Sequence, residues 1–397
     1  MKLTSIRAVN FKSFRHLDIR LDNLNVLIGA NASGKSNFVQ LFAFVRDVVE
    51  SGLENAISIQ GGEYLCNINR AADTNVTIEL AVEPENGDPI VPFMPDQGKS
   101  RVVRCSYRFS LAFTGARTPR INYGWSVVGA GQRRIRIPSR SSEKEVDMRW
   151  RVGPDVFGSF LLDSLEACTG EARRPALLIE HEILRLMLPL NGLKSIATYD
   201  IDSKGPKTGV LFGGKSELES DAHNLAIVLD RILSDGEDRR KFLNFLRDVL
   251  PFAHELDTER LTDGSLFFNM RERFSHVPMP ASFLSDGTID LISIIAILYF
   301  ERKPFVVIEE PERNLHPSLI SKLVQLFKDA SRQKQIIIST HSPEIVRYVE
   351  PNELILISRD PSGSSHADRP ANKAQVQQFL RDEISMEELY VQNLLEV

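Results

Sequence analysis

Cysteine is scarce in this chain, with only Cys66, Cys105 and Cys168 among 397 residues. An odd number of cysteines, at spacings that match no metal motif, argues against a disulfide framework and favours a reduced, cytoplasmic protein. The N-terminus lacks the apolar stretch of a signal peptide, and the sequence has no run of about 18 apolar residues, so we expect no membrane span. No heptad pattern persists over three or four heptads, which argues against a long coiled coil.

Positive charge is also lacking overall, because the net charge of the chain is −5. The charge is nevertheless uneven, since 13 Lys/Arg and only 3 Asp/Glu lie between Lys99 and Arg151. Such asymmetry is typical of a surface that binds nucleic acid or another acidic partner, and a solvated arginine-rich β face is the alternative. The arginine-rich segment 101–151 therefore makes DNA a candidate partner. Its most closely spaced arginines are Arg133, Arg134, Arg136 and Arg140.

The hydrophobic pattern changes along the chain in a way that predicts an α/β fold. The first 150 residues alternate apolar and polar positions around one helical segment at 35–51, which predicts an antiparallel, strand-rich lobe containing a single long helix. Residues 151–255 have mostly helical spacing and predict a helical insertion lobe. Residues 256–397 alternate strands and helices, which predicts a parallel sheet. The expected domains are therefore 1–150, 151–255 and 256–397.

A phosphate-binding motif follows the short apolar run at 25–28. The segment Gly29–Ser36 fits GxxxxGK[ST] in full, and its glycines let backbone N–H groups curl around phosphate oxygens. Lys35 would reach the β- and γ-phosphates, and the Ser36 hydroxyl would bind Mg²⁺. A glycine-rich turn that merely caps a helix is the alternative. The predicted nucleotide-binding residues are Gly29, Asn31, Ala32, Ser33, Gly34, Lys35, Ser36 and Asn37.

Two carboxylates end a second buried strand, where ligands bind in an open α/β sheet. The strand is 305–308, and Glu309 and Glu310 follow it. We expect Glu309 to hold the Mg²⁺ shell and Glu310 to orient the attacking water as a general base. A pair of solvated acids at a strand end is the alternative.

Two shorter motifs complete the set. In Leu284-Ser285-Asp286-Gly287-Thr288, a hydroxyl and a glycine precede an apolar helix, which suits a second anion site at Ser285 and Gly287. A simple serine N-cap is the alternative reading. The second motif places His341 just after the strand 335–338, where the imidazole can reach a γ-phosphate as a hydrogen-bond donor. A structural histidine is the alternative there.

The order of these four motifs resembles that of ABC-type P-loop ATPases. The sequence is most similar to the SMC/RecF/OLD branch, and within it to short stand-alone AAA-family ATPases. The shared segments are Asn10-Phe-Lys-Ser-Phe14, Asp221-Ala-His-Asn-Leu225, LSDGT, Glu309 to Pro317 and STHSP. The resemblance implies ATP and Mg²⁺ as cofactors. It also implies an ATP-dependent homodimer or higher oligomer, in which Ser285 and Gly287 contact the γ-phosphate held by the other subunit.

The chain departs from the family pattern at several points. Glu309 stands where most ABC proteins have aspartate, although its longer side chain should still reach the Mg²⁺ shell. Gln60, before Gly61-Gly62, is the best candidate for the metal-binding glutamine of the Q-loop. The insertion lacks the coiled-coil arms of SMC proteins. Too few residues follow His341 for an independent domain, so we expect no OLD-type nuclease domain.

Several functions fit this pattern. The first is an ATP-driven dimer that switches a separate effector protein, with defence against foreign DNA as a family-level association. The second is a RecF-like, DNA-binding ATPase, supported by the arginine-rich segment 101–151. A nucleotide-locked scaffold with little turnover is the third. The LSDGT motif, which corresponds to the signature motif of ABC-type ATPases, and the histidine motif argue against a P-loop kinase or a different motor.

Overall fold

Each of the two structural units of the chain is assembled from segments that lie far apart in the sequence. In the computed structural model, the first unit comprises Met1–Asp22, Ala32–Ile196 and Ile357–Asp368. The second unit comprises Asn23–Asn31, Ala197–Leu356 and Arg369–Val397. The domain ranges predicted from the sequence follow the chain in order and stay a prediction.

The structure describes most, but not all, of the chain. The described residues are 2–67, 75–83, 102–112, 120–129, 147–149, 196–374, 376, 385–392 and 394–396, and of these the side chains at 53, 54, 63, 102–112, 120–129, 147–149 and 396 are not described. Residues 151–195 of the predicted helical insertion lobe lie outside the described residues. So do Arg133, Arg134, Arg136 and Arg140 of the arginine-rich segment.

The first unit is built on a mainly antiparallel sheet with the strand order β7-β6-β5-β4-β1-β2-β16. Neighbouring strands from β6 to β2 run antiparallel, whereas β7 runs parallel to β6 and β16 runs parallel to β2. This confirms the antiparallel character predicted for the N-terminal part. The elements are β1 (Lys2–Phe11), β2 (Phe14–Arg20), α1 (Lys35–Ser51), α2 (Leu53–Ile59), η1 (Gly62–Leu65), β4 (Val76–Glu83), β5 (Val102–Ala112), β6 (Arg120–Gly129), β7 (Asp147–Arg149) and β16 (Ser365–Asp368).

Aromatic side chains fix the tight turn between β1 and β2 against helix α1. Phe11 and Phe14 pair across the turn, and both rings are fully buried. The Phe11 ring centroid lies 6.1 Å from that of Phe44, and the Phe14 centroid lies 6.3 Å from that of Phe38. Burying a phenylalanine side chain stabilises a fold by about 1.5–3 kcal/mol. The shared segment Asn10–Phe14 is therefore a hydrophobic anchor for the helix that begins at the P-loop.

The second unit contains the strand order β15-β3-β14-β13-β8, in which the neighbours from β15 to β13 run parallel. Every residue of β3 and β14 is buried, as in parallel strands that are covered on both faces. The parallel sheet predicted for the C-terminal part is confirmed, and together the two units form a mixed α/β fold. The strands are β3 (Leu24–Ile28), β8 (Ile196–Tyr199), β13 (Phe305–Glu309), β14 (Gln335–Ser339) and β15 (Leu354–Arg359).

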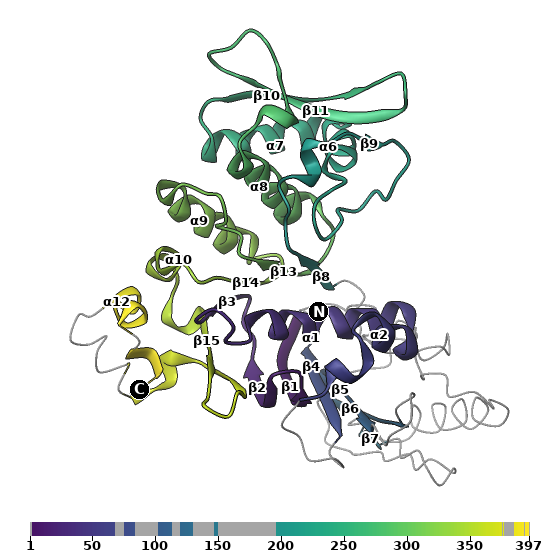
Figure 1. Cartoon of the computed structure of the whole chain (residues 1–397), viewed down its shortest axis with the longest axis vertical. Helices are drawn as coiled ribbons and strands as arrows, with labels where there is room; N and C mark the ends of the chain where they lie inside the picture. Colours follow the sequence, from purple (N-terminus) through teal and green to yellow (C-terminus); the bar gives the residue numbers. More distant parts are fainter. Residues whose placement is uncertain are drawn as a thin grey trace, which may run out of the picture. The chain divides into compact units, whose positions relative to one another are not determined.

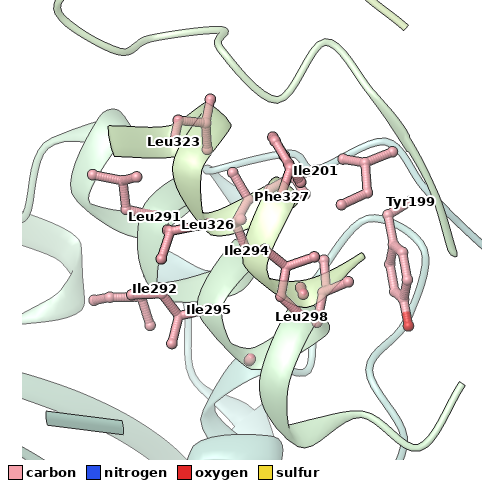
Figure 2. Close-up of a cluster of buried hydrophobic side chains, with 14 of the residues drawn as sticks. Tyr199, Ile201, Leu291, Ile292, Ile294, Ile295, Leu298, Leu323, Leu326 and Phe327 are labelled. Atoms are coloured by element: carbon pink, nitrogen blue, oxygen red, sulfur yellow. The ribbon is translucent and has the colours of Figure 1, made fainter. Parts of the chain in front are cut away.

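One hydrophobic core joins this sheet to the helices of the second unit. Buried side chains of α8 and α9 pack together, and Tyr199 and Ile201 belong to the same cluster (Figure 2). The β10–β11 hairpin packs on α6 and α7 (Figure 1). Within the described ranges, no helix reaches the length and apolarity that a membrane crossing requires. The main elements are α6 (Leu225–Ser234), α7 (Gly236–Val249), β10 (Ala253–Arg260), β11 (Ser265–Glu272), α8 (Asp286–Ile295) and α9 (Ile320–Ala330).

Short elements connect these parts. α8 continues into one π-helical turn, and several 3-10 turns and two-residue strands join the longer elements. They are η3 (Gly205–Lys207), β9 (Val210–Leu211), β12 (Met279–Pro280), η4 (Ala281–Phe283), η5 (Ala296–Phe300), η6 (Pro317–Leu319), α10 (Pro343–Tyr348), η7 (Pro351–Glu353), η8 (Pro370–Asn372), α12 (Met386–Val391) and η9 (Leu394–Glu396).

Asn224, in the shared segment before α6, organises a loop. Its side chain is buried, and its Oδ1 accepts a hydrogen bond of 2.9 Å from the Glu219 amide. Its Nδ2 donates to the carbonyls of Lys215 and Glu217, each at 2.8 Å. A buried amide satisfied in this way closes the loop without secondary structure. The part played by Asn224 in this segment is therefore structural.

Candidate nucleotide-binding site

Three of the predicted motifs lie at the carboxyl ends of neighbouring parallel strands. β3, β14 and β13 are adjacent in the sheet, and Glu309 pairs with Ser339 in register. Because the strands are parallel, all three end at the same edge, which is where α/β sheets bind ligands. β3 leads into Gly29, β13 into Glu310, and β14 into the loop with His341. The structure thus brings together residues that are more than 300 positions apart in the sequence.

The P-loop backbone has the conformation of an anion cradle. Gly34 has a φ of 117° and Ala32 has a φ of 60°, so the loop turns through left-handed geometry before α1 begins at Lys35. Among the described residues, no side chain caps the N-terminus of α1, and its first turn holds no acid. The Ser33 hydroxyl is buried with no hydrogen-bond partner in the described part of the chain. A helix start of this kind favours an anion, so the residues present fit a phosphate group.

The side chains of the remaining P-loop residues differ in exposure and in hydrogen bonding. Asn31 and Ser36 are exposed, whereas Lys35 is only 8 % exposed. The Asn37 side chain is engaged by the protein, because its Nδ2 donates a hydrogen bond of 2.8 Å to Ser13 Oγ in the turn after β1. The predicted nucleotide contact of Asn37 stays a prediction, and this amide also ties α1 to that turn.

Glu310, the predicted general base, is contacted by the side chains of a histidine and an arginine. Its φ of 43° is unusual for a residue with a side chain and costs about 1–2 kcal/mol. His341 Nδ1 lies 3.3 Å from one carboxylate oxygen of Glu310, and Arg313 Nη2 lies 3.2 Å from the other. The same Arg313 nitrogen lies 3.2 Å from Asp200, which follows β8. Sequence reasoning missed Arg313, although it belongs to the quoted segment from Glu309 to Pro317.

Thr340 connects the loop after β14 to the loop after β13. Its side chain is fully buried and donates a short hydrogen bond to Glu312, while it accepts one of 2.9 Å from the Ser342 amide. Its backbone amide donates to the Leu27 carbonyl of β3 at 2.9 Å. Burial raises the pKa of the Glu312 carboxyl, and the Thr340 hydroxyl partly opposes that rise. Sequence reasoning also missed this pair, because it follows from the adjacency of β13 and β14.

Ser285 is the N-cap of helix α8. Its exposed side chain accepts a hydrogen bond of 3.2 Å from the Thr288 amide, and its Oγ lies 2.8 Å from the Thr288 hydroxyl. Asp286 forms a 2.5 Å ion pair with Lys207, which lowers the pKa of the Asp286 carboxyl. The structure therefore bears out the capping role, and an exposed hydroxyl at a helix N-terminus also remains available to an anion.

Gly287 allows α8 to touch the loop that follows β13. A Cβ at this position would lie 2.5 Å from the backbone oxygen of Asn314, so only glycine fits there. Asn314 has a φ of 65°, and its Nδ2 donates a hydrogen bond of 3.0 Å to Asp290 of α8. The predicted nucleotide contact of Gly287 stays a prediction, because its observed role is this close backbone approach. The signature helix and the loop carrying Glu310 are thus in direct contact.

Comparison with known families covers both halves of the chain. The model described as "AAA domain, putative AbiEii toxin, Type IV TA system" matches residues 174–347, and the "AAA ATPase domain" model matches residues 1–142. Among solved structures, an SMC head bound to the C-winged helix domain of ScpA is similar with a TM-score of 0.55 at 15 % identity, covering 93 % of this chain and 98 % of that chain. The Smc head domain of Pyrococcus furiosus has a TM-score of 0.50 at 15 % identity, with coverages of 96 % and 99 %. At these identities, the likeness shows the fold.

Two curated proteins are similar to this chain in sequence. Endonuclease GajA of Bacillus cereus is 22 % identical over 368 residues, which is 90 % of this chain and 58 % of that protein. RecF of Desulforudis audaxviator is 47 % identical over 45 residues, which is 11 % of this chain and 12 % of that protein. In sequence and fold, the chain is similar to P-loop ATPases of the SMC/RecF/OLD type. It spans little more than half the length of GajA.

Gln60 lies near helix α1, but its side chain is engaged by a lysine. Its Oε1 accepts a hydrogen bond of 3.1 Å from Lys12 Nζ, which also donates to Gln40 Oε1 at 2.5 Å. Burial lowers the pKa of Lys12. A cation could use the Gln60 oxygen only after this ammonium moves away, so the metal-binding role of Gln60 stays a prediction.

Proposed function

We propose that the chain binds ATP with Mg²⁺ and hydrolyses it. The observation that supports this function best is the meeting of Gly29, Glu310 and His341 at one edge of adjacent parallel strands. In this proposal, backbone amides of Gly29–Ser36 and the Lys35 ammonium bind the β- and γ-phosphates. Ser36 and Glu309 would hold Mg²⁺, which supplies positive charge that stabilises the transferred phosphate.

Glu310 is the general base of the proposed hydrolysis. Its carboxylate orients a water molecule and accepts a proton from it, while His341 donates a hydrogen bond to the γ-phosphate. The contacts of Glu310 with His341 and Arg313 support this role, because they fix the direction of the carboxylate.

Phosphate release from purified variants tests the assignment. Glu310→Gln should lower the rate by about 100-fold or more, because it removes the base, and should keep ATP binding. Lys35→Ala should lose nucleotide affinity instead. Glu259→Gln makes the same chemical change on an exposed residue of β10 and serves as the matched control. Phosphate release by Glu310→Gln near the wild-type rate would contradict the role, and negligible turnover by the wild type would favour the nucleotide-locked scaffold.

We further propose that ATP closes two copies of the chain head-to-tail. Ser285 and Gly287 of one copy would then share the triphosphate bound by Gly29–Ser36 of the other. The exposed Ser285 hydroxyl at the N-terminus of α8 supports this arrangement. ATP binding would draw the copies together, and hydrolysis would release them.

Light scattering of Glu310→Gln, with and without ATP–Mg²⁺, tests the dimer. ATP should increase the measured mass, and adding Ser285→Arg should block that increase. Ser234→Arg adds the same charge at the exposed end of α6 and should leave it intact. A constitutive dimer, or ATP-dependent association that survives Ser285→Arg, would show that LSDGT is only a helix cap.

The ATP cycle is proposed to switch a separate effector, with a role in defence against foreign DNA. The similarity to endonuclease GajA, of which this chain spans 58 %, supports this proposal. Affinity purification of the Glu310→Gln variant and of Lys35→Ala from the native host tests it. A protein recovered in stoichiometric amount only with Glu310→Gln is the expected result, and recovery of no such protein would argue against an effector.

DNA binding through the arginine-rich segment 101–151 is the second candidate. It is favoured by the local charge of that segment and by the 45-residue similarity to RecF. Fluorescence anisotropy of labelled duplex DNA should show affinity that falls steeply between 50 and 200 mM salt, as phosphate contacts require. Replacing Arg133, Arg134, Arg136 and Arg140 with alanine should reduce the slope by about 3–4. Equal slopes for the two proteins would rule out this surface.

A further inference from the structure

The turn and strand that follow β15 lie against the P-loop, although more than 320 residues separate them from it. Ser365, the first residue of β16, is fully buried and pairs with Phe14 of β2. Its amide donates a hydrogen bond of 2.8 Å to the Ser13 carbonyl. This part of the chain lies outside the four motifs by which the family is recognised, so nothing in them assigns it a role.

The Ser365 hydroxyl connects three segments of the first unit. Its Oγ donates a hydrogen bond of 2.6 Å to the Ser33 carbonyl and lies 2.8 Å from the Ser13 hydroxyl. Ser13 Oγ in turn accepts the hydrogen bond from Asn37 of α1. A continuous chain of polar groups therefore runs from the P-loop to the first turn of the helix behind it. Satisfied networks of this kind rigidify the backbone that they hold.

The same segment contacts two neighbouring P-loop residues. Arg359, at the end of β15, donates from Nη1 to the Ala32 carbonyl at 3.3 Å and from Nε to the Gly363 carbonyl at 2.9 Å. Gly34 packs so closely that a Cβ there would lie 2.4 Å from Ser365 Oγ and 2.9 Å from Ser13 Oγ. Three consecutive residues of the loop are thus fixed from one side.

The peptide geometry gives these contacts a consequence for the nucleotide site. In a trans peptide, the carbonyl of one residue points opposite to the N–H of the next. Because the Ala32 and Ser33 carbonyls bind Arg359 and Ser365, the amides of Ser33 and Gly34 point away from those side chains. These are amides that a phosphate-binding loop directs at its anion.

We propose that Ser365 is a positioning residue that holds the P-loop in its phosphate-binding conformation before nucleotide arrives, with Arg359 as a second, exposed tether. The proposal rests on the proposed function, because it concerns the affinity of the same loop for the phosphates of ATP. Without the tether, only a fraction of molecules has the competent loop, and the apparent dissociation constant rises by the inverse of that fraction. Glu310 takes no part in these hydrogen bonds, so the rate of the hydrolysis step should not depend on them.

Titration calorimetry with ATP–Mg²⁺ and with inorganic tripolyphosphate tests the proposal, alongside steady-state hydrolysis. Ser365→Ala should raise the dissociation constant for both ligands by about 10-fold, with kcat at saturating ATP unchanged. The equal effect on tripolyphosphate separates a tether on the phosphate loop from a contact to the base. Ser364→Ala is the matched control, since Ser364 is also buried but its hydroxyl bonds within the turn, to Ser362.

Arg359→Ala provides a test that does not depend on a buried site. Arg359 is exposed, so its removal should leave the melting temperature unchanged and raise the dissociation constant by about 2–3-fold. If Ser365→Ala does not fold, the result with Arg359→Ala decides the proposal. Unchanged affinity in the folded variants, with ATP binding intact in the wild type, overturns the positioning role alone. A wild-type chain that binds neither ligand overturns the proposed function and this inference with it.

Discussion

Asp290 in the signature helix should make the stability of this protein depend on pH in a predictable direction. Its side chain is only 4 % exposed, and one carboxylate oxygen has no hydrogen-bond partner among the described residues. The other oxygen accepts the hydrogen bond from Asn314. Burial raises the pKa of Asp290 from its ordinary value of 3.8 to about 6; the Asn314 hydrogen bond and the Arg313 charge oppose the rise, and Asp286 and Asp202 add to it.

The size of the effect follows from this pKa. Between pH 4 and 6 the folded protein keeps the Asp290 proton that the unfolded chain has released, so the free energy of unfolding falls as the pH rises through this window. Each pKa unit is worth about 1.36 kcal/mol, so the loss is about 3 kcal/mol by pH 7.5. Asp290→Asn abolishes the titration, and its amide oxygen can still accept the Asn314 hydrogen bond. About 1 kcal/mol of this loss is already present at pH 4.5, so relative to the wild type the variant should gain about 2 kcal/mol between pH 4.5 and pH 7.5.

Urea unfolding of both proteins at pH 4.5, 6.0 and 7.5 measures this difference. Asn314→Gly removes the donor that favours the ionised carboxylate while it keeps the left-handed backbone, so the pH-dependent loss should become larger in that variant. A stability difference between Asp290→Asn and the wild type that stays constant within about 0.5 kcal/mol across the range would refute the reasoning, because a change of about 2 kcal/mol is expected.

Three further predictions concern contacts within the second unit. Gly287→Ala should destabilise the fold by about 1–3 kcal/mol in urea unfolding, because its methyl group meets a main-chain oxygen; Gly236→Ala, where nothing lies within 4 Å, should be neutral or stabilising. Thr340→Val should cost about 1–3 kcal/mol, and more at pH 8 than at pH 5, because Glu312 loses the donor that favours its charged form; equal costs at both pH values would argue against the pair. Tyr390→Phe removes the hydroxyl that contacts the first P-loop glycine, so calorimetry should show about 2–3-fold weaker ATP binding with an unchanged melting temperature.

The sequence predicted elements whose signals are local. Helix α1 begins at Lys35 and ends at Ser51, as expected from the P-loop and the apolar spacing after it. The strand before Glu310 and the strand before Thr340 were also predicted, because parallel strands covered on both faces read as short apolar runs. Within the predicted helical lobe, helix α6 begins at Leu225, directly after the loop that the Asn224 side chain holds by hydrogen bonds.

Elements with polar sequences were not predicted. Half of the residues of strand β10 (Ala253–Arg260) are charged, and only Ala253 and Leu256 are buried. Its pairing with β11 therefore contributes more to strand formation than its own apolar pattern does. Strand β16 has only four residues, and the role of its first residue, Ser365, is evident only from its contacts with Ser13 and Ser33. A single sequence carries no local signal for contacts across more than 300 residues, and Arg313 and Thr340 were missed as functional residues for the same reason.

Residues of different motifs in this chain contact one another, so the joint occurrence of the motifs is more informative than any single motif. Gly34 is required by the serines packed against it, and Gly287 by the Asn314 carbonyl. Thr340 of the histidine motif binds Glu312 of the acidic segment. Such packing restricts the residue type at these positions whether or not they contact a nucleotide. An isolated LSDGT is therefore consistent with a simple helix cap. LSDGT and the segment from Glu309 to Pro317 pack against each other through Gly287 and Asn314. Their joint occurrence therefore predicts the position of helix α8 on the loop that carries Glu310.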